Sequence, residues 1–133
     1  METKKIIINV GASSDYFGAF AENCQGIYGA GSTVQEAKEN VLEGLKLFVK
    51  HNANNLPEIL KGEYEIVYKY DTQSFLNYYN KIFTNVALER LTGINQKLLH
   101  HYSSGLKKPR EAQRKKIEKA LHNLGKELLA VEL

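Results

Sequence analysis

Three acidic residues, Glu36, Glu39 and Glu43, have the side chains that a metal-dependent nuclease would use. Such an enzyme needs three or four carboxylates that converge on one or two metal ions. These three acids fall in a stretch that we predict to be a helix surface, where solvated charge is the simpler explanation. The first predicted strand carries only Asn9 as a polar side chain. We therefore expect no metal, no cofactor and no catalysis.

The lone cysteine and a group of glycines are the other candidates for chemistry. Cys24 has no histidine near it in the sequence, so we interpret it as a packed or loop thiol. A single cysteine excludes an intramolecular disulfide and indicates a reducing, cytoplasmic setting. Gly26, Gly29 and Gly31 do not match a dinucleotide fingerprint, because no helix begins at the required place. Gly29 and Gly31 instead predict a bulge or a close backbone approach in the third strand. Because the first half has no catalytic pattern, we interpret it as a binding surface rather than an active site.

The charge of the chain is unevenly distributed. The 133 residues carry a net charge of +3, with 43% apolar and 25% charged residues, which is ordinary for a globular protein. Residues 1–71 have 7 Lys and Arg against 10 Asp and Glu, whereas residues 72–133 have 11 against 5. No apolar run approaches the roughly 20 residues of a membrane span. We predict two very small domains, 1–71 and 72–133, and the basic half suggests a nucleic-acid partner.

The first half alternates strand patterns with one helix pattern. Thr33 and Glu36 form a capping box, with Glu36 reaching back to the start of an amphipathic helix. Pro57 opens a short helical turn. A helix between the third and fourth strands allows a right-handed crossover into a mixed sheet. The predicted order is βββαβ, with strands at 4–10, 16–20, 27–31 and 63–70, and the helix at 33–51.

Residues 16–45, YFGAFAENCQGIYGAGSTVQEAKENVLEGL, resemble the signature of HicB antitoxins. The shared features are an aromatic strand, an acidic loop, a glycine-rich strand and the GSTVQEA start of a helix. Many members have Pro-Asp and Pro-Gly-Cys where this chain has Ala21-Glu22 and Asn23–Gly26. The resemblance implies a partial, catalytically empty RNase H-like domain that binds a HicA-type mRNA interferase toxin. The toxin-binding residues that it suggests are Tyr16, Phe17, Phe20, Glu22 and Tyr28.

The second half reads as four helices. We predict them at 72–82, 84–92, 95–103 and 110–122, and residues 125–133 as either helix or strand. Leu88 and Leu91 are expected to point inward, and Gly93 to end the second helix with a left-handed turn. Two short helices joined by a tight glycine turn are the pattern of a helix-turn-helix unit.

The string TGINQKLLHHYSSGLKKP, residues 92–109, resembles the XRE-type helix-turn-helix family. Leu88 matches a core position of the family, whereas Glu89 replaces a residue that is usually small and predicts a different packing of the second helix. The resemblance implies that the third helix reads base edges, although His101 is equally well explained as plain helix surface. The residues assigned to base reading are Asn95, Gln96, Lys97, His100 and His101. Those assigned to phosphate contacts are Asn85, Lys107, Lys108 and Arg110.

Together the two resemblances imply an α+β protein, in which a partial RNase H-like βββαβ domain precedes an all-α helix-turn-helix domain. The implied function is that of a cytoplasmic antitoxin, a homodimer or tetramer, which neutralises its toxin and represses its own operon by binding double-stranded promoter DNA. One alternative is a stand-alone transcriptional regulator with a different sensing domain. Another is a degenerate nuclease, which the scarcity of suitable carboxylates disfavours.

Overall fold

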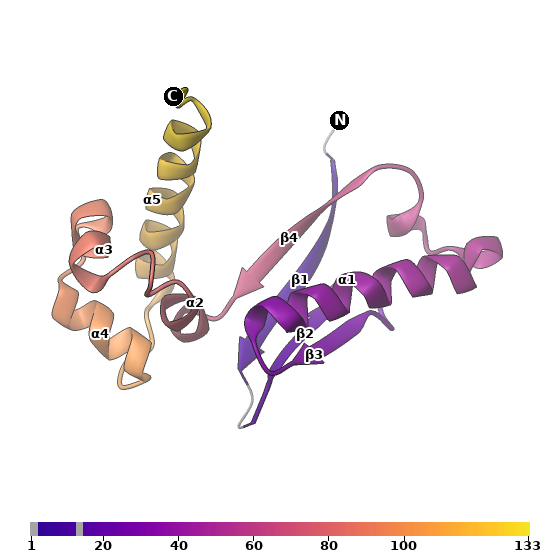
Figure 1. The fold of residues 1–133 in the computed structure, drawn as a ribbon, viewed down its shortest axis with the longest axis horizontal. Helices are drawn as coiled ribbons and strands as arrows, with labels where there is room; N and C mark the ends of the chain where they lie inside the picture. Colours follow the sequence, from indigo (N-terminus) through magenta and orange to yellow (C-terminus); the bar gives the residue numbers. More distant parts are fainter. Residues whose placement is uncertain (1–2, 13–14) are drawn as a thin grey trace. The chain divides into compact units, whose positions relative to one another are not determined.

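The chain is a mixed α+β protein that divides into two compact units, Met1–Asp71 and Thr72–Leu133. The computed structural model describes residues 3–12 and 15–133 (Figure 1). The described part of the first unit contains a four-stranded mixed sheet and one long helix, and the second unit is entirely helical.

The sheet of the first unit has the strand order β3-β2-β1-β4. Strand β1 pairs antiparallel with β2 and parallel with β4, and β2 pairs antiparallel with β3. Helix α1 leads from β3 to β4 and so makes the crossover that a parallel β1–β4 pair requires. The bounds of these elements are Lys4–Ala12 (β1), Phe17–Ala21 (β2), Tyr28–Gly31 (β3), Val34–His51 (α1) and Tyr64–Tyr70 (β4). The short helical turn predicted at Pro57 is a 3-10 helix, Glu58–Leu60, which follows another at Ala53–Asn55.

Helix α1 covers one face of this sheet, and two glycines let it come close. A Cβ on Gly29 would lie 2.7 Å from the carbonyl carbon of Asn40, and one on Gly31 would lie 2.7 Å from the amide nitrogen of Ala37. The Asn40 side chain also donates a 2.6 Å hydrogen bond to the Ala30 carbonyl. The close backbone approach predicted for these glycines is therefore confirmed. The buried side chains between helix and sheet are Ile6, Ile8, Val10, Ala19, Ala21, Val34, Ala37, Val41 and Leu45.

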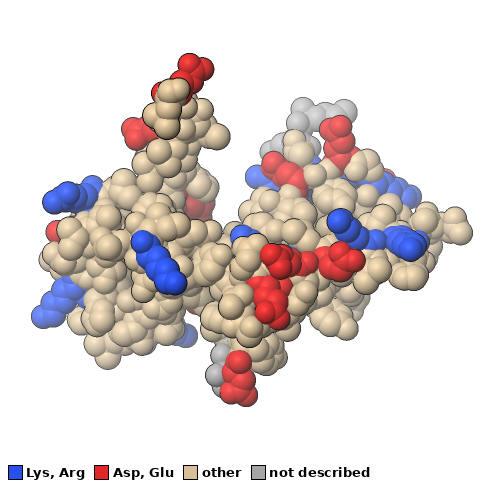
Figure 2. Space-filling model, viewed as in Figure 1, with Lys and Arg blue, Asp and Glu red and all other residues tan. Residues whose placement is uncertain are grey.

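Of the two hydrogen bonds of the predicted capping box at the start of α1, only the one accepted by Thr33 forms as predicted. Thr33 Oγ1 accepts a 3.0 Å hydrogen bond from the Glu36 amide, as a capping box requires. The Glu36 carboxylate reaches back to the Ser32 hydroxyl, at 3.0 Å, where the box would have it accept from the Thr33 amide. Figure 2 shows acidic side chains over the start of α1 and basic ones toward its end, which is the distribution that the helix dipole favours.

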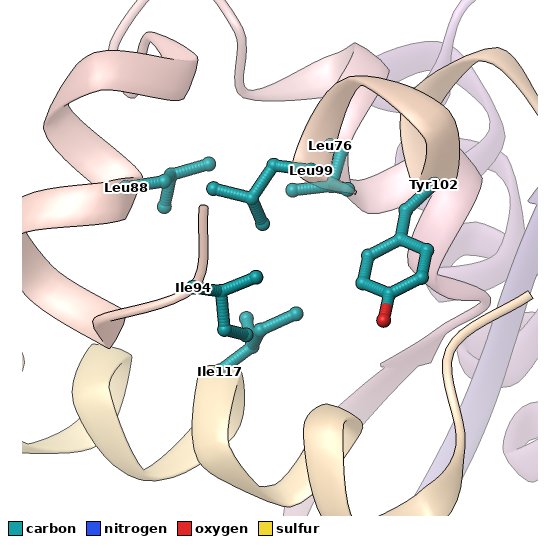
Figure 3. Packing of buried hydrophobic residues seen from close by; sticks show 6 residues of the cluster. All are labelled: Leu76, Leu88, Ile94, Leu99, Tyr102 and Ile117. Atoms are coloured by element: carbon teal, nitrogen blue, oxygen red, sulfur yellow. The ribbon is translucent and has the colours of Figure 1, made fainter. Parts of the chain in front are cut away.

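The second unit contains four helices: α2 (Thr72–Tyr78), α3 (Asn85–Thr92), α4 (Gln96–Ser104) and α5 (Glu111–Leu129). Their buried side chains converge on one small core, in which Leu88 of α3 and Leu99 of α4 face Ile117 of α5 (Figure 3). The complete cluster consists of Leu76, Leu88, Ile94, Leu99, Tyr102 and Ile117.

Three expectations for the second unit need correction. Helix α2 ends at Tyr78 rather than near Ile82, because the amides of Ile82 and Phe83 both donate to the Tyr79 carbonyl and close a turn. Leu91 was expected to point inward but is 37% exposed, because α3 packs against the core of the unit through Leu88. Helix α5 continues to Leu129, so most of the segment whose structure was left open is helical.

Candidate nucleic-acid interface

The turn between α3 and α4 is fixed by its own backbone. Thr84 caps α3, where its hydroxyl accepts a 3.1 Å hydrogen bond from the Ala87 amide. Gly93 ends α3 with φ of 77°, a left-handed conformation that glycine adopts without a steric penalty. Its amide donates to the Glu89 carbonyl at 2.8 Å. The predicted start and stop of this helix are both confirmed.

A buried hydroxyl strengthens the same turn. Thr92 is 6% exposed, and its Oγ1 donates to the Leu88 carbonyl at 2.7 Å. The same oxygen accepts a 3.0 Å hydrogen bond from the Ile94 amide. One side chain therefore ties the last turn of α3 to the residue that inserts into the core after the glycine.

Two side chains cap α4 and set the angle at which it leaves the turn. Asn95 Oδ1 accepts a 2.8 Å hydrogen bond from the Lys97 amide. Glu89 Oε2, on α3, accepts a 2.6 Å hydrogen bond from the Gln96 amide. A carboxylate is favoured at a helix N-terminus because the dipole is positive there. From the resemblance, Glu89 is a departure that predicts a different packing of the second helix; in the structure its carboxylate links α3 to the start of α4.

The exposed face of α4 carries most of the residues predicted to read DNA. Residues at positions i, i+1 and i+4 of a helix lie on one side of it, since each advances about 100° around the axis. Gln96, Lys97 and His100 have this spacing and are all exposed. The buried Leu99 and Tyr102 occupy the opposite side. Asn95 lies beside this face at the start of α4, but its side-chain oxygen Oδ1 already caps the helix.

His101 does not belong to this exposed face. It is half-buried, and its Nδ1 is shielded from solvent with no hydrogen-bond partner within the described residues. Its backbone carbonyl accepts a 3.1 Å hydrogen bond from the Lys107 amide. His101 therefore lies at the edge between α4 and the following loop, and the structure separates it from His100.

Basic residues line a hollow between the end of α4 and the start of α5. Gly105 closes α4 with φ of 84°, and the chain then reaches α5 through an exposed stretch that includes Lys107 and Lys108. Arg110 occupies the N-cap position of α5 and makes no capping hydrogen bond with its side chain. The hollow has a volume of about 550 Å³ and is lined by Leu98, Tyr102, Lys107, Lys108, Arg110 and Gln113. The fourth residue assigned to phosphate contacts, Asn85, lies apart from it as the first residue of α3 and is half-buried.

The charge of this surface is strongly positive. Between Thr84 and Arg110 the sequence has five Lys and Arg residues and one acid. That acid is Glu89, whose carboxylate is engaged with the start of α4. The exposed cations of this segment are therefore left to attract an anionic partner.

No protein-family model, curated protein or solved structure matches this chain. Among residues 3–12 and 15–133, no group of three or more His, Cys, Asp and Glu side chains is placed to hold a metal ion. Within the same residues, no helix is both long and apolar enough to cross a membrane.

The first unit offers a second candidate surface, on the face of the sheet opposite α1. Phe20 and Tyr28 are cross-strand partners on β2 and β3, and they are 53% and 75% exposed. The Tyr16 ring lies 4.0 Å from where a Cβ on Gly18 would be, which places it beside this face; Tyr16 is 50% exposed. The half-buried Ile7 extends the surface onto β1. Three of the residues suggested for toxin binding therefore lie together.

The other two residues suggested for toxin binding are placed differently. Phe17 is half-buried and lies three positions before Phe20 on β2. Side chains an odd number of positions apart point to opposite faces of a sheet, so Phe17 lies on the face that α1 covers. Glu22 follows β2 and forms a 3.6 Å ion pair with Lys69. Asn23 then holds this segment against β1, accepting from the Ile7 amide at 3.0 Å and donating to the Lys5 carbonyl at 2.7 Å.

Cys24 lies in the loop between β2 and β3 and is 6% exposed. Burial raises the pKa of its thiol, because the thiolate loses hydration in this packed environment. The group is thus held in its neutral, unreactive form. The interpretation of Cys24 as a packed loop thiol is confirmed.

Proposed function

We propose that the second unit is a helix-turn-helix domain that binds double-stranded DNA through α4. The observation that carries this proposal is the capped α3–Gly93–α4 pair, which turns the polar face of α4 away from the core. A helix with its side chains is about 10–12 Å across, and the major groove is about 12 Å wide. Helix α4 therefore has a suitable size and a suitable exposed face for this groove.

Gln96, Lys97 and His100 are the residues that we assign to base contacts. A glutamine amide can pair with both N6 and N7 of adenine, and a lysine donates to the acceptors of guanine. A good bidentate contact contributes about 1–3 kcal/mol of discrimination against the wrong base. Asn95 has a smaller role than the sequence suggested, because binding a base through its oxygen would compete with the cap on α4.

Lys107, Lys108 and Arg110 are assigned to the DNA backbone. They surround the hollow at the start of α5, where the first amides of the helix also favour an anion. Each phosphate that a cation neutralises adds about −0.9 to the slope of log K against log salt concentration. Loss of one of these residues is therefore expected to weaken binding to all sequences equally and to flatten the salt dependence.

For the whole chain, the proposed function is that of a HicB-type antitoxin that represses its own operon. The residues of the Tyr16–Leu45 signature support it, as does the exposed aromatic group of Tyr16, Phe20 and Tyr28 on the open sheet face. Large exposed apolar patches mark protein-interaction sites. The net charge of −3 on residues 1–71 suits a basic toxin.

DNA binding is tested with the promoter of the operon that encodes the chain. The full-length protein is titrated against this DNA and against a scrambled duplex at several salt concentrations. Gln96→Ala is expected to reduce the preference for the promoter by the value of one base contact, about 1–3 kcal/mol. Lys108→Ala should instead weaken binding to both duplexes by the same factor. Equal affinity of the wild-type protein for promoter and scrambled DNA would contradict the proposal.

Toxin neutralisation is tested separately. The small gene product encoded beside this chain is co-expressed with it, and both complex formation and growth rescue are measured. Phe20→Asp and Tyr28→Asp should each abolish rescue. Tyr68→Asp is not a suitable control, because the Tyr68 ring contacts the Lys38 ammonium group and its replacement would disturb α1. The matched control is Leu47→Asp, an exposed apolar position on α1. DNA binding without any complex or rescue would favour the stand-alone regulator.

A further inference from the structure

The hollow at the start of α5 has a buried tyrosine in its wall. Tyr102 is only 5% exposed, and it lines the hollow. Figure 3 shows its hydroxyl pointing away from Leu99 and Ile94 and toward α5. Among residues 3–12 and 15–133, this hydroxyl has no hydrogen-bond partner. A polar group that is removed from bulk water in this way costs free energy unless a water molecule or a ligand supplies the missing hydrogen bond.

Three cations border the same hollow. Lys107, Lys108 and Arg110 line it, and none of them forms an ion pair within the described part of the chain. The acid at the start of α5, Glu111, is paired at 3.4 Å with Lys115, which does not line the hollow. Positive charges that share a hollow repel one another, so an anion that enters it is attracted by all three.

Uncharged donors complete the wall of the hollow. The half-buried Gln113 lines it, and its side-chain amide can donate two hydrogen bonds. The first amides of a helix have no partner within the helix, and the Arg110 side chain does not cap those of α5. Cations, a hydroxyl and amides are the groups that bind phosphate in proteins, so the hollow has the composition of a phosphate site.

The size and charge of the hollow favour a small organic phosphate over the backbone of DNA. Its volume of about 550 Å³ lies in the roughly 300–1,000 Å³ range of small-molecule pockets and leaves room for more than a phosphate group. The half-buried Leu98 and the Tyr102 ring give the remainder of the ligand an apolar wall. A phosphate monoester carries about 1.5–2 negative charges at neutral pH, whereas each phosphate of DNA carries one. Three unpaired cations therefore match the monoester better.

We propose that this hollow binds the phosphate of a small phosphate monoester of mononucleotide size, with the Tyr102 hydroxyl as one of the donors. The organic part of the ligand would lie against Leu98. Since Lys107, Lys108 and Arg110 are also the residues assigned to the DNA backbone, the ligand and DNA would exclude each other. Only this regulatory consequence rests on the proposed function, because the pocket itself does not depend on DNA.

The test is a two-dimensional NMR titration of the full-length protein, from micromolar to millimolar ligand, at constant ionic strength. The probes are adenosine monophosphate (AMP), adenosine and inorganic phosphate. AMP should bind at least tenfold more tightly than adenosine or inorganic phosphate, with the largest shifts at residues 105–113. Lys107→Ala should weaken AMP binding several-fold, whereas Lys119→Ala, which removes an exposed cation of α5 outside the hollow, should leave it unchanged.

Tyr102→Phe isolates the hydroxyl, because it keeps the ring that packs in the core. The melting temperature should not fall, since the hydroxyl has no partner in the described chain. AMP binding should weaken about tenfold or more, because a hydrogen bond to a charged group corresponds to at least that factor. The matched control is Tyr64→Phe on β4 of the first unit, which should change neither quantity. Unchanged AMP affinity in Tyr102→Phe, equal affinity for AMP and inorganic phosphate, or no AMP binding at all would each overturn the inference.

Competition with promoter DNA separates this inference from the proposed function. AMP should displace the DNA at the concentrations that saturate the hollow, whereas AMP that binds without displacing DNA would overturn the regulatory part. AMP binding by a protein that binds no DNA would overturn the proposed function and leave the pocket intact. DNA binding that depends on Lys107, without any AMP binding, would show that the hollow serves the DNA backbone alone and would overturn the inference.

Discussion

Replacing Glu89 with alanine gives the sharpest test of how α4 is held. The Glu89 carboxylate accepts a 2.6 Å hydrogen bond from the Gln96 amide. A hydrogen bond to a charged group contributes about 1.5–3 kcal/mol to stability. Glu89 is half-buried, so solvent screening places its bond at the lower end of that range. Alanine recovers a few tenths of a kcal/mol through its higher helix propensity.

The expected net loss in Glu89→Ala is therefore about 1 kcal/mol. For a domain of this size, that corresponds to a fall of roughly 4–8 °C in the melting temperature. Glu89→Gln keeps an acceptor and loses only the charge, so it should fall between wild type and Glu89→Ala. Thermal unfolding by circular dichroism gives the magnitudes, and hydrogen exchange shows whether the loss is confined to the second unit.

The family resemblance makes the opposite prediction for the same variant. Small residues are usual at this position in XRE-type domains, so alanine would be neutral or stabilising if the packing followed the family. A melting temperature for Glu89→Ala equal to or above that of the wild type would refute our explanation of the α3–α4 angle.

Three further predictions follow from individual contacts. Thr92→Val should destabilise the second unit by about 1–3 kcal/mol in urea unfolding, because it leaves the buried Ile94 amide without its acceptor; an unchanged midpoint would show that the hydroxyl is dispensable. Gly29→Ala should lower the stability of the first unit by about 1–3 kcal/mol, because the new Cβ would collide with the backbone of α1. Gly18→Ala is the control and should be tolerated, because its Cβ would lie 4.0 Å from the Tyr16 ring. Cys24 should react with iodoacetamide far more slowly in the native than in the unfolded chain at neutral pH, because burial raises the pKa of its thiol; comparable rates would contradict its burial.

Much of the local structure could be predicted from the sequence, because it depends on neighbouring residues. The cap at Thr33, the start of α3 at Thr84 and its end at Gly93 are local signals, and the structure places each where the sequence predicted it. The end of α5 could not be decided in the same way. The apolar residues near Leu129 fit a helix or a strand equally well, so periodicity alone does not separate the two.

The candidate sites were less predictable, because they depend on tertiary contacts. Glu89 contacts the Gln96 amide across a turn, and a sequence pattern gives no sign of this bond. The resemblance suggested both Phe17 and Phe20 for toxin binding, but the pleat of β2 places them on opposite faces of the sheet. His101 follows His100 in the sequence, yet its ring lies at a half-buried edge. The signal for the two phenylalanines is the strict alternation along β2. The signal for His101 is the four-residue spacing of the half-buried Leu98 and the buried Tyr102 on α4.

Selection of DNA ligands from a random duplex pool tests the central claim most directly. The account predicts that the wild-type protein enriches a defined sequence, and that Gln96→Ala changes the preference at one or two positions while Lys108→Ala preserves the preferred sequence at lower affinity. Enrichment of no sequence by the wild-type protein, or of the same sequence by Gln96→Ala with unchanged selectivity, would contradict the assignment of α4 as the helix that reads DNA.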